Sequence, residues 1–102
     1  MTGAHQALSL LGLAHRARKI VSGEEPAIRE IRRGRAKLLI VSTDASVNTK
    51  KRMKEKCEFY QVPLFVAFSR KELGKSIGKD NRVVIAVLDE GFAKKIAIHI
   101  RG

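Results

Sequence analysis

The chain has 102 residues, 44% of them apolar, and its 21 Lys and Arg against 10 Asp and Glu give a formal net charge of +11. This length and apolar content predict one domain with a packed core, spanning residues 1–102. The apolar runs are far shorter than the roughly 20 residues that span a bilayer, so we expect no membrane partner. A lone cysteine, Cys57, excludes an internal disulfide framework and is typical of a reducing, cytoplasmic environment.

The surplus of positive charge is the strongest functional signal in the composition. A small domain this basic repels itself unless a polyanion binds it, so nucleic acid is the leading class of partner. Two alternatives are a charge that only keeps the protein in solution and a charge that binds an acidic membrane surface. The second is disfavoured, because no predicted helix combines a strongly basic face with a Trp- or Phe-rich apolar face.

The first predicted element is an amphipathic helix over residues 4–18. Leu8, Leu11 and Ala14 recur in it at helical spacing, and its basic residues stand near its end, where the helix dipole favours cations. Residues 19–23 follow as a short predicted strand that ends in a turn at Gly23.

A second helix is predicted to begin at this turn and to run to about Arg33. Ser22 and Glu25 have the spacing of a capping box, in which two side chains satisfy backbone N–H groups at a helix start. Pro26 is tolerated only in a first turn, and Gly34 favours a helix end. Capping is one interpretation of Ser22 and Glu25, and contact with a ligand is the other.

Strands and helices alternate along the rest of the chain. Continuous apolar runs predict strands over 36–42, 62–68 and 83–88, and cap residues and helical spacing predict helices over 46–60, 69–78 and from 89 onward. A second capping box pairs Ser69 with Glu72, and Asp89 caps the last helix. The side chains expected in the core include Ala27, Ile28, Ile31, Met53, Cys57, Phe59, Phe65, Phe68 and Phe92.

This alternation is typical of helices packed on both faces of a largely parallel sheet. We therefore predict an α/β protein, a three-layer α/β/α sandwich whose four-stranded sheet is mixed and mostly parallel. No linker, repeat or low-complexity stretch interrupts the pattern.

Residues with catalytic or metal-binding potential are few and scattered. The segment from Gly74 to Asp80 superficially resembles a phosphate-binding loop, but it follows a predicted helix rather than a strand and carries Asp80 where a Ser or Thr is needed. The histidines stand alone, without a carboxylate or histidine at ligand spacing. Cys57 has no obvious base beside it. We therefore expect no enzymatic activity, no metal and no cofactor.

Three segments together resemble a known family. They are residues 18–38, beginning RKIVSG and ending IRRGRAKL, the stretch LIVSTD over 39–44, and residues 62–91, which include ELGKSIG and IAVLDEG. The sequence resembles the ribosomal-protein superfamily of the L-seven-Ae and L-thirty-e proteins, and it looks most like the bacterial YlxQ branch. The resemblance implies an α/β/α sandwich and a non-enzymatic protein that binds kink-turns in ribosomal or ribosome-associated RNA, with the ribosome as a further partner.

The resemblance also implies roles for individual residues. Gly23 matches the family glycine that lets the backbone approach RNA, Lys19 matches a basic position just before it, and Arg29 matches a helix lysine. Glu25 stands where kink-turn binders carry asparagine, and Pro26 where they carry glutamate. A later loop, here residues 79–83, covers the bulged bases in such relatives.

Elementary chemistry points to the same region, because a helix that begins after a flexible glycine presents N–H groups to phosphates or base edges. The candidate RNA-binding residues are Lys19, Ser22, Gly23, Glu25, Arg29, Arg33, Lys37, Lys75, Lys79 and Arg82. An alternative interpretation is a protein-interaction module of the translation or transcription machinery, whose basic surface binds an acidic protein.

Overall fold

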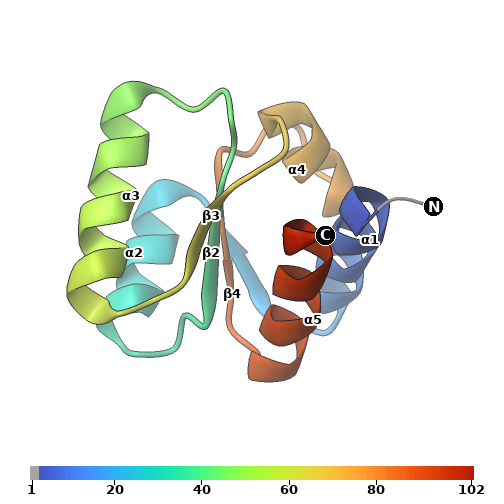
Figure 1. Cartoon of the computed structure of the whole chain (residues 1–102), viewed down its shortest axis with the longest axis horizontal. Helices are drawn as coiled ribbons and strands as arrows, with labels where there is room; N and C mark the ends of the chain where they lie inside the picture. Colours follow the sequence, from blue (N-terminus) through green and yellow to red (C-terminus); the bar gives the residue numbers. More distant parts are fainter. Residues whose placement is uncertain (1–2) are drawn as a thin grey trace.

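A computed structural model describes residues 3–102, so residues 1–2 of the expected domain lie outside the described part. Helices lie on both sides of one central sheet (Figure 1). In chain order the elements are α1 (Gly3–Arg16), β1 (Ile20–Ser22), α2 (Glu24–Arg32), β2 (Leu38–Val41), α3 (Val47–Tyr60), β3 (Leu64–Val66), α4 (Arg70–Ser76), β4 (Val84–Val87) and α5 (Glu90–Arg101). The α/β class and the predicted order of elements are confirmed. No described helix has the length and apolarity to cross a membrane.

The sheet separates two hydrophobic clusters, because neighbouring residues of a strand point to opposite faces. Leu39 and Val41 of β2 face the cluster formed with α2 and α3, whereas Leu38 and Ile40 face the cluster formed with α1, α4 and α5. All four residues of β2 are buried, as the continuous apolar run predicted. Most of the predicted core residues are confirmed, among them Ala27, Ile28, Ile31, Met53 and Cys57.

The thiol of Cys57 and the ring of Phe59, both on α3, differ in their burial. Burial raises the pKa of the Cys57 thiol to about 11, so the sulfur is protonated at neutral pH and behaves as a small core residue. The prediction that Phe59 lies in the core, in contrast, is wrong. The residue is 76% exposed, and its ring stands edge-on to Tyr60 at a centroid distance of 4.9 Å. Phe59 is two residues after the buried Cys57, which is about 200° of rotation on a helix, so it lies on the outer face of α3. The core prediction followed from its aromatic character and not from its position on the helix.

The prediction of a mostly parallel sheet is wrong. The strand order is β1-β4-β2-β3, with β2 and β3 parallel but β4 antiparallel to both β1 and β2. Strands β1, β2 and β3 do run in one direction, as the alternation predicts. β4 runs the other way and lies between β1 and β2, so two of the three neighbouring pairs are antiparallel.

The reversal of β4 has a local cause at Gly74. The segment after α4 folds back along that helix, where Lys79 N–H donates to Gly74 O at 2.9 Å and Arg82 N–H donates to Arg70 O at 3.0 Å. A Cβ at Gly74 would stand only 1.5 Å from Asp80 O, so the return path needs a glycine there. The chain therefore re-enters the sheet at the end where β3 left it, with Val84 opposite Val41.

Helix starts confirm two of the predicted caps and contradict the third. Ser69 and Glu72 form the predicted capping box of α4, and Asp89 accepts the Phe92 N–H at the start of α5. The box expected from Ser22 and Glu25 is wrong, since α2 begins after Gly23 and receives no side-chain cap. Ser22 Oγ instead accepts a hydrogen bond from Arg82, and the Glu25 carboxylate accepts one from Arg52.

The Gly74 contact predicts a large effect of one methyl group. Gly74→Ala should lower the free energy of unfolding by about 3 kcal/mol, because a close backbone approach has no room to relax. Gly91→Ala is the matched control: its Cβ would meet only the Asp89 side chain, at 3.2 Å, and we expect a change within about 1 kcal/mol. Urea unfolding followed by circular dichroism measures both, and equal stabilities would contradict the role given to Gly74.

Candidate nucleic-acid interface

The end of β1, the start of α2 and the segment before β4 meet at one end of the sheet. Gly23 N–H donates to Val84 O at 2.9 Å, and Arg82 Nε donates to Ser22 Oγ at 3.3 Å. Gly23 has φ +102°, a conformation that other residues rarely adopt. These bonds explain why Ser22 is not a helix cap, and they bring the predicted residues Ser22, Gly23 and Arg82 together.

The first turn of α2 has two backbone amides without a partner in the helix. Ala27 N–H already closes the first helical bond to Gly23 O at 3.1 Å, and Pro26 carries no N–H group. The N–H groups of Glu24 and Glu25 precede this bond and have no partner within the helix. Helix starts of this kind suit anions, but here Pro26 leaves two N–H donors where most helices have three, and two acidic side chains flank them.

Those two acidic side chains are held by α3. Arg52 Nη1 donates to Glu24 Oε1 at 3.2 Å, and Arg52 Nη2 donates to Glu25 Oε1 at 2.9 Å. Thr49 Oγ1 adds a longer bond of 3.4 Å to Glu24 Oε2. Arg52 is the main cause that lowers the pKa of Glu25, with smaller contributions from Arg32 and then Arg29. Both carboxylates are thus directed toward α3 and partly neutralised.

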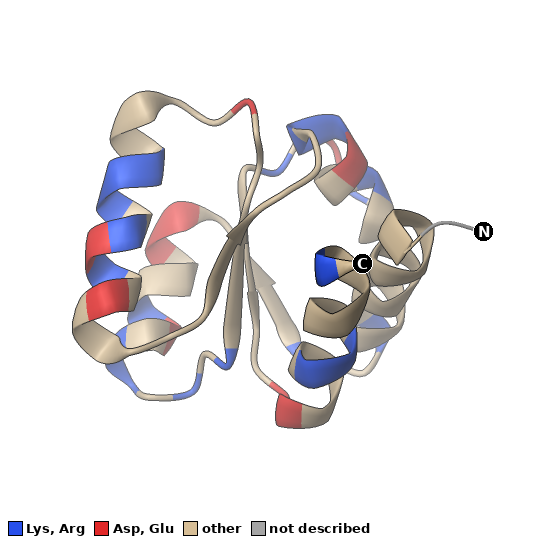
Figure 2. Ribbon diagram, in the orientation of Figure 1, with Lys and Arg blue, Asp and Glu red and all other residues tan. Residues whose placement is uncertain are grey.

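The exposed face of α2 carries three arginines around a shallow hollow. Glu25, Arg29, Arg32 and Arg33 line this hollow, which has a volume of about 330 Å³. All three arginines are exposed, and Arg33 Nη1 also lies 3.6 Å from the buried carboxylate of Glu30. We call these four lining residues the α2 face. Since Arg52 binds Glu25 at the start of the face, the three arginines dominate its charge. Figure 2 shows that Lys and Arg also occur on helices on both sides of the sheet.

The structure does not bring all the predicted residues to this face. Lys19 and Lys37 line a different hollow, at the end of the sheet opposite Gly23, together with Arg18, Glu30 and Arg35. This hollow adjoins the last turn of α2, because Arg33 and Arg35 both contact Glu30 Oε1. The backbones of Lys19 and Lys37 pair with the last residues of β4, because Lys37 N–H donates to Val87 O at 2.8 Å. We predicted Lys19 and Lys37 beside Gly23 because they are close to it in sequence. In the structure, the length of strands β1 and β2 separates these two lysines from Gly23.

The two lysines near α4 also lie apart from the α2 face. Lys75 lines a hollow between α1 and α4, on the other side of the sheet. Lys79 is exposed and belongs to the segment that folds back along α4, three residues before Arg82. Of the two, Lys79 is the one in the segment that reaches Ser22.

Two residues of this site are absent from the candidates predicted from the sequence. Arg32 lines the hollow together with the predicted Arg29 and Arg33. Arg52 binds two carboxylates that stand 27 and 28 positions earlier in the chain. Two adjacent acidic residues at a helix start indicate that a cation lies nearby. Only the packing of α2 against α3 shows that Arg52 is this cation.

Comparison with known proteins places this fold and site in a family. Residues 5–97 match the model of the ribosomal protein L7Ae/L30e/S12e/Gadd45 family, so the chain belongs to it. Within the family it belongs to the YlxQ branch. RNA-binding protein YlxQ of Bacillus subtilis (strain 168) is 58% identical over 87 residues, covering 85% of this chain and 87% of the relative. RNA-binding protein YlxQ of Enterococcus faecium is 47% identical over 97 residues, covering 95% and 93%.

Solved structures agree with the fold. A Bacillus halodurans protein described as having unknown function is 46% identical, with a TM-score of 0.93, over 95% of this chain and 98% of that one. The Giardia lamblia 15.5kD RNA binding protein is 20% identical, with a TM-score of 0.83, over 97% of this chain and 85% of that one. At that identity the second likeness shows the fold alone.

The role of Arg52 leads to a prediction about pKa values. In Arg52→Ala the pKa of Glu25 should rise toward its ordinary value of 4.5, because the largest cause of its lowering is gone. Lys51→Ala, at the neighbouring exposed position, should leave it unchanged. Titration of the Glu25 carboxyl by carbon-detected NMR measures both variants, and an unchanged pKa in Arg52→Ala would show that the ion pair does not form in solution.

Proposed function

We propose that the chain is a non-enzymatic protein that binds folded RNA through the α2 face and the adjoining segment 79–83. The observation that carries this proposal is the set of three exposed arginines around the hollow, beside the two free amides of the first turn. Arginine donors suit both phosphate oxygens and the guanine edge. The relatives named RNA-binding protein and the net charge of +11 support the same class of partner.

A folded RNA fits this surface better than an unstructured strand does. Single strands are bound mainly by stacking bases on exposed aromatic rings. The α2 face has no such ring, and the exposed rings of Phe59 and Tyr60 lie at the far end of α3. Three exposed arginines on one rigid helix suit the fixed phosphate positions of a folded RNA.

Arg29 provides the first test. Arg29→Ala should weaken binding to a folded RNA by about tenfold, and the slope of log K against log salt should become shallower by about 1 if the guanidinium contacts one phosphate. Lys95→Ala, an exposed cation on α5 across the sheet, should change both quantities little. Filter binding at several salt concentrations measures them, and equal losses in the two variants would mean that only total charge matters.

We further propose that the preferred RNA is a kink-turn, as the family resemblance implies. A kink-turn RNA should then bind more tightly than the same duplex whose sheared G·A pairs have been replaced by Watson–Crick pairs. Glu25 and Pro26 make this a demanding test, because a carboxylate accepts hydrogen bonds but donates none. Gel shifts with both RNAs at one salt concentration decide it, and equal affinities would exclude kink-turn recognition while leaving general RNA binding in place.

A further inference from the structure

The outer edge of β3 is open within the described chain. β3 stands last in the strand order, next to β2. Leu39 N–H donates to Pro63 O at 2.9 Å and Ala67 N–H donates to Val41 O at 3.0 Å, so residues 63 and 67 face β2. Because backbone groups alternate along a strand, the N–H and C=O groups of Leu64 and Val66 face outward. No strand among residues 3–102 pairs with them.

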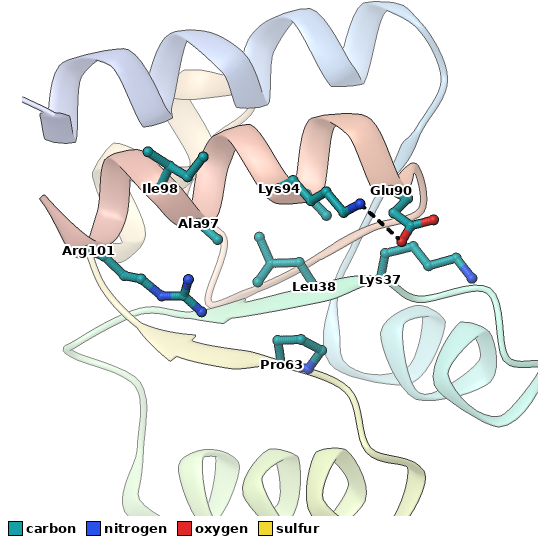
Figure 3. A pocket seen from close by; sticks show the side chains of 9 residues that line it. Lys37, Leu38, Pro63, Glu90, Lys94, Ala97, Ile98 and Arg101 are labelled. Atoms are coloured by element: carbon teal, nitrogen blue, oxygen red, sulfur yellow. Dashed lines mark ion pairs between the residues drawn. The ribbon is translucent and has the colours of Figure 1, made fainter.

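Two hollows flank this edge, one on each face of the sheet. The hollow under α5 has a volume of about 520 Å³, and Leu38, Pro63, Ala97 and Ile98 give it an apolar lining (Figure 3). The hollow beside α3 has a volume of about 490 Å³ and shares Pro63 with the first. A strand added to β3 would place successive side chains alternately toward these two hollows.

Exposed apolar side chains mark the same edge. Val66 is 51% exposed on β3, and Ile98 is 62% exposed on α5 at the rim of the hollow in Figure 3. Phe65 is covered on its α5 side by Arg101, whose guanidinium carbon stands 5.5 Å from the ring centroid. Scattered exposed apolar residues need no explanation, but apolar residues beside open backbone groups match the requirements of strand addition.

The charge around the hollow under α5 selects the kind of segment that would fit. Lys37 and Arg101 stand at its two ends, while Lys94 is paired with Glu90 at 3.6 Å (Figure 3). The rim is therefore positive, which favours acidic groups at the ends of an apolar segment. A second copy of this chain is a poor occupant, because each copy carries a net charge of +11 and the same basic rim.

We propose that the β3 edge and its two hollows bind an extended apolar segment of another protein, flanked by acidic residues, as an added β-strand. The outward backbone groups of Leu64 and Val66 supply hydrogen bonds, and the hollows receive alternate side chains. This surface differs from the α2 face, since α2 packs on β1 and β4 and β3 is the opposite edge of the sheet. It gives the protein-interaction alternative a defined location without displacing RNA.

The test uses the whole chain, without RNA, and a phage-displayed library of random ten-residue peptides as the probe. The enriched peptides should carry acidic residues at the ends of an apolar core. When one such peptide is synthesised, its binding should slow amide exchange at Leu64 and Val66, as measured by NMR. Absence of enrichment, or enriched peptides lacking acidic residues, would overturn the proposal.

Matched variants locate the binding of that peptide. Ile98→Asp should weaken it at least about tenfold, because a charge then enters the apolar hollow. Leu13→Asp, which changes an exposed leucine on α1 at another hollow, should leave it unchanged. Val66→Pro removes an outward N–H and should weaken binding, whereas Val66→Ala keeps that N–H and should weaken it less.

Circular dichroism checks that each variant folds, and if Val66→Pro does not, then Ile98→Asp and the exchange at Leu64 decide the outcome. Equal binding by the Ile98→Asp and Leu13→Asp variants would refute the location. Sedimentation showing that the edge pairs copies of this chain would refute the occupant. Arg29→Ala should bind the peptide normally, so a failure of RNA binding and a failure of this proposal are separate results.

Discussion

The return of the chain along α4 determines how the sheet is assembled. Gly74 lets the backbone at Asp80 approach closely, and the chain re-enters the sheet at the end where β3 left it. β4 then runs antiparallel between β1 and β2 rather than extending the parallel order. This insertion carries the segment before β4 to the end of β1, where Arg82 reaches Ser22 and Val84 receives the Gly23 N–H. The start of α2 is therefore positioned by contacts with residues about 60 positions later in the chain.

Electrostatics at the start of α2 depends on a contact between helices. Two carboxylates beside an anion-binding helix start would repel phosphate if they were free. Arg52 binds both of them from α3, so Glu25 points toward that helix while Arg29, Arg32 and Arg33 remain exposed. A chain of net charge +11 does not need each cation at the interface. It needs the acidic groups near the α2 face to be paired with cations outside that face, and Arg52 of α3 pairs with Glu24 and Glu25 in this way.

Much of the fold was predictable from local patterns. The alternation of elements, the buried run of β2 and the capping box of Ser69 and Glu72 all depend on residues close together in the chain. The direction of β4 was not predictable, because it follows from the packing of Gly74 against a residue of the returning segment. Phe59 was misplaced for a different reason, since its aromatic side chain suggested burial although its spacing from Cys57 puts it on the outer face of α3.

The same distinction between local patterns and packing applies to the candidate site residues. Arg29 and Arg33 were identified from the helix that carries them, and the structure places them on one face. Lys19 and Lys37 were included because they are near in sequence, but a strand carries the chain away from the site within a few residues. Arg52 could not be found, since nothing in the sequence states that α3 packs beside α2. Contacts within one helix or strand can be predicted from the sequence, whereas contacts between elements can be identified only in the folded structure.

NMR titration of the isotope-labelled chain with a folded RNA tests the central claim most directly, because it reports every backbone amide at once. The largest shift changes should fall on residues 23–33 and 79–83, with little change along β3 and α5. Changes concentrated at residues 18–19 and 35–37, with the α2 amides unaffected, would contradict the account and move the RNA surface to the other end of the sheet.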